Sequence, residues 1–446
     1  MVQQAKTIIL GAGMSGLGAA LASHLPAYEA TCRPGGVCYS YYVDFDGVLR
    51  DPRHQDVSGC FRFEPAGGHW MFGMSPDSLA RMEKFAAFRK YNRQAAVYFS
   101  QNGLLVPFPL QDNLRYLDKP LRDRIVAEIC FDRPVNNSES CSLKDWLLYN
   151  FGPTLCDLFF FPFNQRYSAG LYTDIAPQDT HKSLFDRRRV LQGASENTDD
   201  RGYNSVFYYP GAGLDYVIRQ ISAECTIHFD FAVSGIDTRD RNVFFSNGTR
   251  MSYDKIISTI PLNHMARLCG IDVGSQADPA TAVLVVNIGA VKGTSDFSPY
   301  QWIYLPSSSS GMHRFGFYNH VDSSFLPMNY RNRADIVSIY AERSFSSASP
   351  LRMEERSSAS SAIVAELRDW GVISEPIVVS STFTDPAYTW SRRGSTWAQH
   401  AIRCLAEAGI SQIGRYGGWR FQGMLESFEQ GLSAGRSTIL EITRQM

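Results

Sequence analysis

The sequence predicts an α/β fold of two or three interleaved domains, because 446 residues exceed what a single hydrophobic core usually serves. A β-rich run, a glycine turn and an Ala- and Leu-rich helix open the chain, at residues 7–10, 11–16 and 17–25. Helical and aromatic sequence follows over residues 77–170, and short alternating strands return at 206–261 and 281–342. Strand, turn and helix in this order are typical of a nucleotide-binding unit.

Composition and charge exclude several classes of partner. Lysine plus arginine number 43 and aspartate plus glutamate 44, so no overall charge favours nucleic acid or an anionic membrane. The nine cysteines form no C-x-x-C pair, which argues against a disulfide framework or a zinc site, and we expect no metal. No signal peptide is visible, and the longest apolar runs are far shorter than the roughly 20 residues of a membrane span. We therefore expect a soluble, cytoplasmic protein.

The glycine motif Gly11-Ala12-Gly13-Met14-Ser15-Gly16 carries the most explicit chemistry. Its first glycine permits a tight turn, its second lets the backbone approach a pyrophosphate, and its third lets the helix pack closely on the strand. Glu29 follows at a position suited to accept a ribose hydroxyl. The second pair, Gly35-Gly36, favours FAD over NAD, although a loop with positive φ is the plainer interpretation of that pair alone.

Four further segments contain candidate site residues. They are Gly67-Gly68-His69, the proline-broken run Leu105–Asn113, the helical end Phe161-Pro162-Phe163-Asn164, and the pair Tyr304 and Arg314, which are ten residues apart. Each has a structural alternative when taken alone: a satisfied core histidine, a loop, a buried helix end and a surface arginine that opens a strand.

In this order and over nearly the whole chain, these motifs resemble UDP-galactopyranose mutases of the eukaryotic type, within the FAD-dependent amine-oxidase and protoporphyrinogen-oxidase-like group. The resemblance implies roles for individual residues. The catalytic residues would be His69 beside the flavin and Arg314 and Arg189 on a diphosphate. FAD would be bound by Gly11, Gly13, Ser15, Gly16, Glu29, Gly35, Gly36, Val233, Arg415 and Ser427. The substrate would be bound by Phe108, Gln111, Asn164, Asn204, Tyr304, Arg314, Tyr388 and Phe421.

For three of these assignments the sequence itself allows an alternative interpretation. Arg189 ends a run of three arginines that is equally typical of a solvated face. Tyr388 is equally consistent with a buried ring. The chain has Phe421 where the family pattern carries tyrosine, and a lost neutral hydrogen bond costs on the order of 1 kcal/mol, so the sugar nucleotide could differ from UDP-galactose.

The same reasoning divides the chain into three parts. A Rossmann-like FAD-binding domain would comprise residues 1–75, 205–270 and 405–446. A helical insertion would comprise residues 76–180. An antiparallel β-sheet substrate domain would comprise residues 181–204 and 271–404.

The resemblance implies a mutase that interconverts pyranose and furanose forms of a nucleotide sugar. The reaction would proceed through a flavin N5–sugar adduct on reduced FAD, with NADPH or NADH as candidate reductant, and homo-oligomerisation is left open. Two alternatives stand beside it. One is an FAD-dependent oxidoreductase of the amine-oxidase or protoporphyrinogen-oxidase type, and the other is a flavin-binding protein without catalysis.

Overall fold

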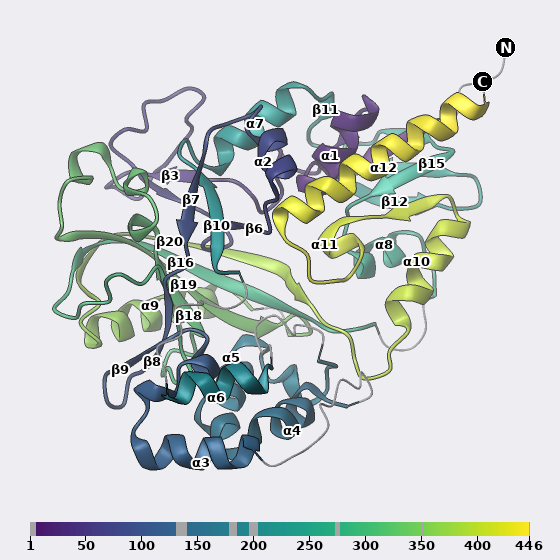
Figure 1. Cartoon of the computed structure of the whole chain (residues 1–446). Coiled ribbons are helices and arrows are strands. Elements are labelled where there is room, and N and C mark those ends of the chain that lie inside the picture. The colour runs from purple at the N-terminus through teal and green to yellow at the C-terminus, as the bar shows by residue number, and fades with distance from the viewer. Residues whose placement is uncertain are drawn as a thin grey trace.

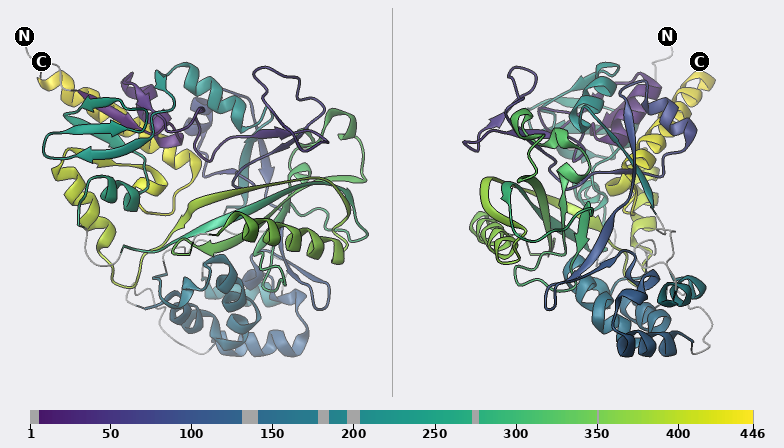
Figure 2. Two further views of the ribbon diagram at one scale, coloured as in Figure 1. Left: turned by 180° about the vertical axis from the view of Figure 1, so that it is seen from behind. Right: turned by 60° about the vertical axis from the view of Figure 1, so that its left-hand side comes forward.

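The computed structural model describes residues 6–130, 141–177, 185–195, 204–272, 277–349 and 351–445. A parallel sheet flanked by helices lies at one end of the molecule, a long twisted sheet crosses its middle, and a group of helices lies at the opposite end (Figure 1). Figure 2 shows the same arrangement from two other directions. The expected α/β class with a Rossmann-like unit is confirmed.

The parallel sheet orders its five strands β11-β2-β1-β15-β21. Their bounds are β1 (Thr7–Leu10), β2 (Ala27–Tyr28), β11 (Ile227–His228), β15 (Lys255–Ser258) and β21 (Ile410–Gln412). Leu10 pairs with Tyr28 on one side and with Ser258 on the other, so the carboxyl ends of the central strands lie together. The loops that begin at Gly11, Glu29 and Thr259 therefore open at one edge of the sheet, where doubly wound folds bind ligands.

Helices α1 (Met14–Ser23) and α12 (Met424–Gln445) pack against each other beside this sheet. Glycines make the close approach possible: a Cβ on Gly18 would lie 2.3 Å from the Phe428 carbonyl oxygen, and one on Gly431 would lie 2.0 Å from that of Ser15. Four further helices and a three-stranded sheet complete this end: α7 (Leu214–Ala223), α8 (Leu262–Leu268), α10 (Trp397–Glu407), α11 (Gly414–Gly417), β12 (Val233–Asp237), β13 (Asn242–Phe245) and β14 (Arg250–Ser252). Gly248 turns β13 into β14 with a φ of 85°, as the Asn247-Gly248 pair predicts.

The central sheet orders its seven strands β20-β16-β19-β18-β17-β8-β9. The bounds are β8 (Ala95–Phe99), β9 (Leu104–Pro107), β16 (Ala280–Lys292), β17 (Trp302–Tyr304), β18 (Arg314–Phe317), β19 (Ile336–Ser346) and β20 (Ile373–Thr389). All pairs are antiparallel except β17 with β8. Helix α9 (Met353–Asp369) packs its buried Ile363 and Leu367 with Val337 and Ile339 of β19.

The helical prediction for residues 77–170 is wrong between residues 88 and 107. There the chain forms β7 (Phe88–Asn92), β8 and β9. The runs Ala95–Phe99 and Leu104–Pro107 are short and apolar, and their hydrophobic pattern alone does not separate strand from helix. Pairing of β8 with β17 makes this segment a strand, because it buries Val97 fully opposite Tyr304.

Helices do form on either side of these strands. Before them lies α2 (Pro76–Met82), which packs near α1 and α7. After them come α3 (Lys119–Cys130), α4 (Leu143–Leu155) and α5 (Phe161–Tyr167), and with α6 (Arg187–Ser195) these form the group at the far end. Phe151, Phe159 and Phe160 are buried in this group and share a core with β16 and β17. The predicted domain boundaries remain a prediction, and residues 181–184, 196–203, 273–276 and 350 of the third domain lie outside the described residues.

Two small sheets join the parts. One pairs β6 (Met71–Phe72) and β7 with β10 (Val206–Pro210), and the other pairs β3 (Tyr41–Val43) with β4 (Leu49–Arg50) and β5 (Phe61–Phe63). All nine cysteines are thiols without a disulfide. Along the described part of the chain, no helix combines the length and apolar character needed to cross a membrane.

Candidate active site

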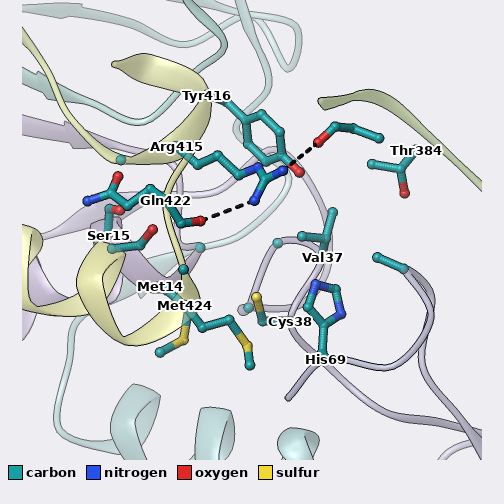
Figure 3. Close-up of a pocket in the computed structure, with 18 of the residues that line it drawn as sticks. Met14, Ser15, Val37, Cys38, His69, Thr384, Arg415, Tyr416, Gln422 and Met424 are labelled. Carbon is teal, nitrogen blue, oxygen red and sulfur yellow. Dashed lines mark hydrogen bonds between the residues drawn. The ribbon is translucent and has the colours of Figure 1, made fainter. Parts of the chain in front are cut away.

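A cavity of 920 Å³ lies between the carboxyl edge of the parallel sheet and the central sheet. Its size is in the upper part of the range of cofactor and small-molecule sites, roughly 300–1,000 Å³. Segments from the whole chain line it, including the Gly11–Ser15 turn, the His69 loop, Tyr304 and the Arg415 turn. Figure 3 shows His69 and Arg415 reaching this space from separate segments.

The glycine turn forms one end of the cavity. Gly11 has a φ of 95°, and a Cβ on Gly16 would lie 1.9 Å from the Gly11 carbonyl oxygen, so both are required by the turn itself. Gly13 is not required by the protein's own packing, because a Cβ there would meet no other atom closer than 3.9 Å. Gly13 also caps α1 without a side-chain hydrogen bond, so the first N–H groups of α1 are available to a phosphate.

Glu29 lies beside this turn and is almost fully buried. One carboxylate oxygen accepts a hydrogen bond from the Ala12 backbone N–H at 2.8 Å, and the other accepts from Thr31. Val233 and Phe231 line the cavity with Glu29, and the Phe231 N–H donates to the Glu29 carbonyl at 2.9 Å. Their roles in holding a ribose and an adenine stay predictions.

A second helix end faces the same cavity. The first turn of α12, including Met424 and Ser427, lines it beside Met14 at the start of α1. Helix N-termini carry a partial positive charge, worth typically 0.3–1 kcal/mol to a nearby anion. The cavity is therefore suited to a ligand with negative charge at two places.

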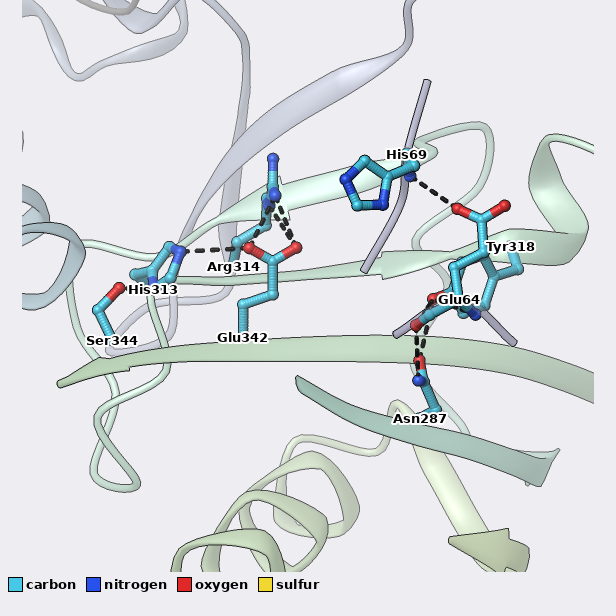
Figure 4. Close-up of polar contacts among 8 residues, drawn as sticks. All are labelled: Glu64, His69, Asn287, His313, Arg314, Tyr318, Glu342 and Ser344. Carbon is cyan, nitrogen blue, oxygen red and sulfur yellow. Dashed lines mark hydrogen bonds and ion pairs between the residues drawn. The ribbon is translucent and has the colours of Figure 1, made fainter. Parts of the chain in front are cut away.

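His69 presents its ring to the cavity from a buried loop. Burial, followed by the charge of Arg415, lowers the pKa of His69 to about 4, so the imidazole is neutral near pH 7. Its Nδ1 is buried and has no partner among the described residues, which marks a place for a polar atom of a ligand. Its backbone N–H donates to Glu64 Oε2 at 2.9 Å (Figure 4).

Arg314 also lines the cavity, where it forms a bidentate ion pair. Its Nη2 contacts both carboxylate oxygens of Glu342, at 2.6 and 2.7 Å. Burial is the largest single effect and opposes ionisation of Glu342, but the charges and hydrogen bonds of Arg314 and His313 together outweigh it and lower the pKa of Glu342 to about 2. His313 Nε2 lies 3.4 Å from the same carboxylate. Glu342 thus fixes the guanidinium, and 18% of the Arg314 side chain stays exposed toward the cavity.

Aromatic residues shape the space around the two arginines. The rings of Phe108 and Tyr304 lie 4.5 Å apart, centre to centre. The Arg415 guanidinium lies 5.3 Å from the centre of Tyr388 and 4.7 Å from that of Phe421, within the range of a cation–π contact. Asn204 also lines the cavity, and with these residues most of the predicted substrate set lies together.

Four predicted residues do not line the cavity. Gly16 acts through the turn as described above. Gln111 and Asn164 are buried in the neighbouring helical part, where Asn164 Nδ2 donates to the Phe160 carbonyl at 2.8 Å. Arg189 lies on α6, 3.4 Å from Asp112 Oδ2. Their roles in binding stay predictions.

The sequence reasoning missed several ionisable residues at this site, of which Arg93 and Glu64 illustrate two different cases. Arg93 lines the cavity, donates to the Phe108 carbonyl at 3.3 Å and lies 5.2 Å from the Phe108 ring centre. Nothing distinguishes a lone arginine in that stretch of sequence. Glu64 is fully buried below the His69 loop. A carboxylate within the mainly apolar run Phe61–Phe72 was the available signal, because ionisable groups are rarely buried without a role.

The residues present fit FAD. The turn has room for a pyrophosphate at Gly13, Glu29 faces the ribose position, and His69 Nδ1 offers an unmet hydrogen bond at the far side of the cavity. Among the described residues, no group of three His, Cys, Asp or Glu side chains is arranged to hold a metal ion.

Comparisons with known proteins agree with this geometry. The family model "Flavin containing amine oxidoreductase" matches residues 27–286. A crystal structure of reduced UDP-galactopyranose mutase superposes with a TM-score of 0.82 at 22% identity, over 98% of this chain and 96% of that one. A putative protoporphyrinogen oxidase from Exiguobacterium sp. 255-15 gives 0.69 at 15% identity over the whole of both chains. Putrescine oxidase bound to putrescine gives 0.57 at 17% identity, over 98% and 99%. The chain belongs to the flavin-containing amine oxidoreductase family and has the fold of UDP-galactopyranose mutase.

Proposed function

We propose that this protein is a mutase that interconverts the pyranose and furanose forms of a nucleoside diphosphate sugar of the UDP-galactose type. The observation that carries the proposal is the position of Arg314. A guanidinium held by Glu342 faces the same cavity as the FAD cradle and the neutral His69. A guanidinium at the substrate side attracts an anion such as a diphosphate and repels the ammonium form of an amine.

When bound, reduced FAD would supply the nucleophile for the anomeric carbon of the sugar as the bond from that carbon to the diphosphate breaks, with no net oxidation. The chain must hold the departing diphosphate and keep the sugar in place. Arg314 would supply positive charge for the diphosphate, with Tyr304 and Tyr388 as hydroxyl donors. Arg415, which is expected to bind FAD, lies beside Tyr388 in the same cavity. Phe108 would pack against the base or the sugar.

His69 would orient the flavin without supplying a proton. Its low pKa keeps the imidazole neutral, so it can donate one hydrogen bond and accept another. The first turn of α12 would stabilise negative charge on reduced FAD, because a helix N-terminus attracts anions.

The remaining expectations belong to the proposal as well. NADPH or NADH would act as the reductant, the substrate would be a nucleotide sugar in the cytoplasm, and homo-oligomerisation stays open. Phe421 lines the cavity without the hydroxyl that the mutase pattern carries. The substrate could therefore be a different sugar nucleotide from UDP-galactose.

The test compares dithionite-reduced and oxidised protein with a panel of UDP-sugars under anaerobic conditions. Chromatography should detect conversion between pyranose and furanose forms with reduced protein alone. An Arg314→Met variant, loaded with FAD, should bind UDP weakly and lose conversion. Turnover restricted to oxidised protein, with formation of hydrogen peroxide in air, would instead identify an oxidoreductase of the amine-oxidase or protoporphyrinogen-oxidase type.

A further inference from the structure

We propose that Glu64 is a positioning residue that holds the Gly67–His69 segment in place against the flavin. The inference rests on flavin binding and not on mutase chemistry. Glu64 lies on the loop after β5 and is completely buried. Its position below the segment is shown in Figure 4.

Both carboxyl oxygens of Glu64 have a partner. Oε2 accepts a hydrogen bond from the His69 backbone N–H at 2.9 Å, five residues along the chain. Oε1 lies 2.5 Å from the hydroxyl of Tyr209, on β10. The carboxyl group therefore ties the loop that carries His69 to the strand that leads into α7.

The main chain of Glu64 is held by the central sheet. Its carbonyl oxygen accepts from Asn287 Nδ2 at 2.9 Å, and the Tyr318 hydroxyl lies 3.4 Å from both its N–H and its carbonyl. Asn287 is buried on β16 and also accepts from the Tyr318 hydroxyl at 2.9 Å. The next carbonyl, that of Pro65, accepts from Thr382 on β20. Glu64 is thus a fixed point from which the loop extends toward the cavity.

The loop itself lacks side chains that could fix it. Gly67 has a φ of 77°, and a Cβ there would lie 2.4 Å from Glu342 Oε1. A Cβ on Gly68 would lie 2.7 Å from the Tyr340 hydroxyl. Two glycines are needed to pass these groups, and glycines leave the backbone with more freedom than other residues. The hydrogen bond from His69 to Glu64 removes that freedom at the residue that faces the flavin.

The surroundings favour the protonated acid. Burial raises the pKa of Glu64 to about 8, against the hydrogen bonds from Tyr209 and His69 and the charge of Arg62. Asp215 on α7 acts in the same direction as burial. At pH 7 Glu64 is therefore largely neutral, and glutamine is its close mimic: the amide oxygen accepts from His69, and the amide N–H stands in for the carboxyl O–H as a donor to Tyr209, whose hydroxyl donates to Oε1 when Glu64 is ionised.

The experiment uses FAD-loaded wild type, Glu64→Gln, Glu64→Leu and Tyr209→Phe, without any sugar nucleotide. FAD affinity, the flavin reduction potential at pH 7 and the visible circular dichroism of the flavin are measured. Glu64→Gln should match wild type in all three. Glu64→Leu should bind FAD about tenfold more weakly, as expected for one lost hydrogen bond to a buried group, and should shift the potential and the dichroism. For Tyr209→Phe, all three measurements should lie between those of Glu64→Gln and those of Glu64→Leu.

Glu366 provides a matched control for loss of a buried carboxylate. It accepts hydrogen bonds from Ser308 and Ser310 and does not line the cavity. Glu366→Leu should lower stability and leave the flavin potential unchanged. A wild-type potential and dichroism in folded Glu64→Leu would overturn the proposal. If Glu64→Leu does not fold, wild-type values in Tyr209→Phe or altered values in Glu64→Gln would overturn it. Absence of mutase activity would bear on the proposed function alone.

Discussion

The guanidinium of Arg314 is bound to both oxygens of the Glu342 carboxylate, and that carboxylate also lies 3.4 Å from His313. The pair is buried on one side and open to the cavity on the other. A phosphate that reaches Arg314 would therefore meet a guanidinium already held in one orientation. Such preorganisation lowers the cost of ordering a side chain on binding.

Arg314→Lys should weaken binding of UDP by about tenfold, because an ammonium cannot contact a phosphate and Glu342 through one planar fork. Isothermal titration of FAD-loaded protein measures this. Arg333→Lys is the control, since Arg333 also pairs with a carboxylate, that of Asp335, but is half exposed and does not line the cavity. Equal affinities for UDP in the two variants would contradict the assignment of Arg314.

Gly13→Ala should separate cofactor binding from folding. A methyl group at Gly13 meets no protein atom closer than 3.9 Å, so the apoprotein should keep its melting temperature. The same methyl group would block close approach of a pyrophosphate, and FAD affinity should fall by at least about tenfold. Flavin fluorescence titration measures the affinity.

Two other glycines provide control substitutions for this prediction. Gly16→Ala should prevent folding, because its Cβ would lie 1.9 Å from a carbonyl oxygen. Gly235→Ala should change neither property, because its Cβ would have no neighbour within 4 Å. Wild-type FAD affinity in Gly13→Ala would show that the cradle is not a pyrophosphate site.

Phe421→Tyr should strengthen binding of UDP, with a dissociation constant about fivefold lower, because a neutral hydrogen bond contributes on the order of 1 kcal/mol. Phe421 lines the cavity beside Arg415, so a hydroxyl there would lie near the proposed diphosphate. Phe244→Tyr, at an exposed ring outside the cavity, is the control. Unchanged or weaker binding in Phe421→Tyr would remove Phe421 from the diphosphate site.

Stability should depend on pH through Glu64. The folded pKa of about 8 lies above the ordinary value of 4.5, so between these values the folded chain keeps a proton that the unfolded chain has released. Rising pH then lowers the free energy of unfolding by about 1.4 kcal/mol per unit from this group. Glu64→Gln lacks the proton, so its stability relative to wild type should rise between about pH 5 and pH 8.

Urea unfolding at several pH values measures this difference. The charged and titratable groups that face Glu64 include Tyr209, Arg62, Asp215, Tyr318 and Cys38, and all are retained in the variant. A difference in the free energy of unfolding that stays constant with pH would show that Glu64 is ionised in the folded protein.

Much of the fold could be predicted from local pattern. The strand Thr7–Leu10 was expected at these residues, and the helix after it begins at Met14, three residues before the predicted start. Residues 88–107 could not be predicted in the same way. Their strands exist because β8 pairs with β17, which is some two hundred residues away in sequence, and no local signal records that pairing.

The residues of the site likewise fall into those that local motifs predict and those that only strand pairing places. Motifs of fixed spacing brought Gly13, Glu29, His69 and Arg314 to one cavity, because each is tied to a particular turn or strand end. Glu342 could not be found from sequence. It faces Arg314 because β18 and β19 pair in a register that places the two residues opposite each other.

The electron balance of turnover tests the proposed function most directly. Protein reduced once with dithionite, then freed of excess reductant without oxygen, is given a UDP-sugar while flavin absorbance and product are followed together. The account predicts many product molecules for each flavin, with the flavin still reduced at the end. No product from reduced protein, together with one substrate oxidised for each flavin reduced when the protein starts oxidised, would contradict it.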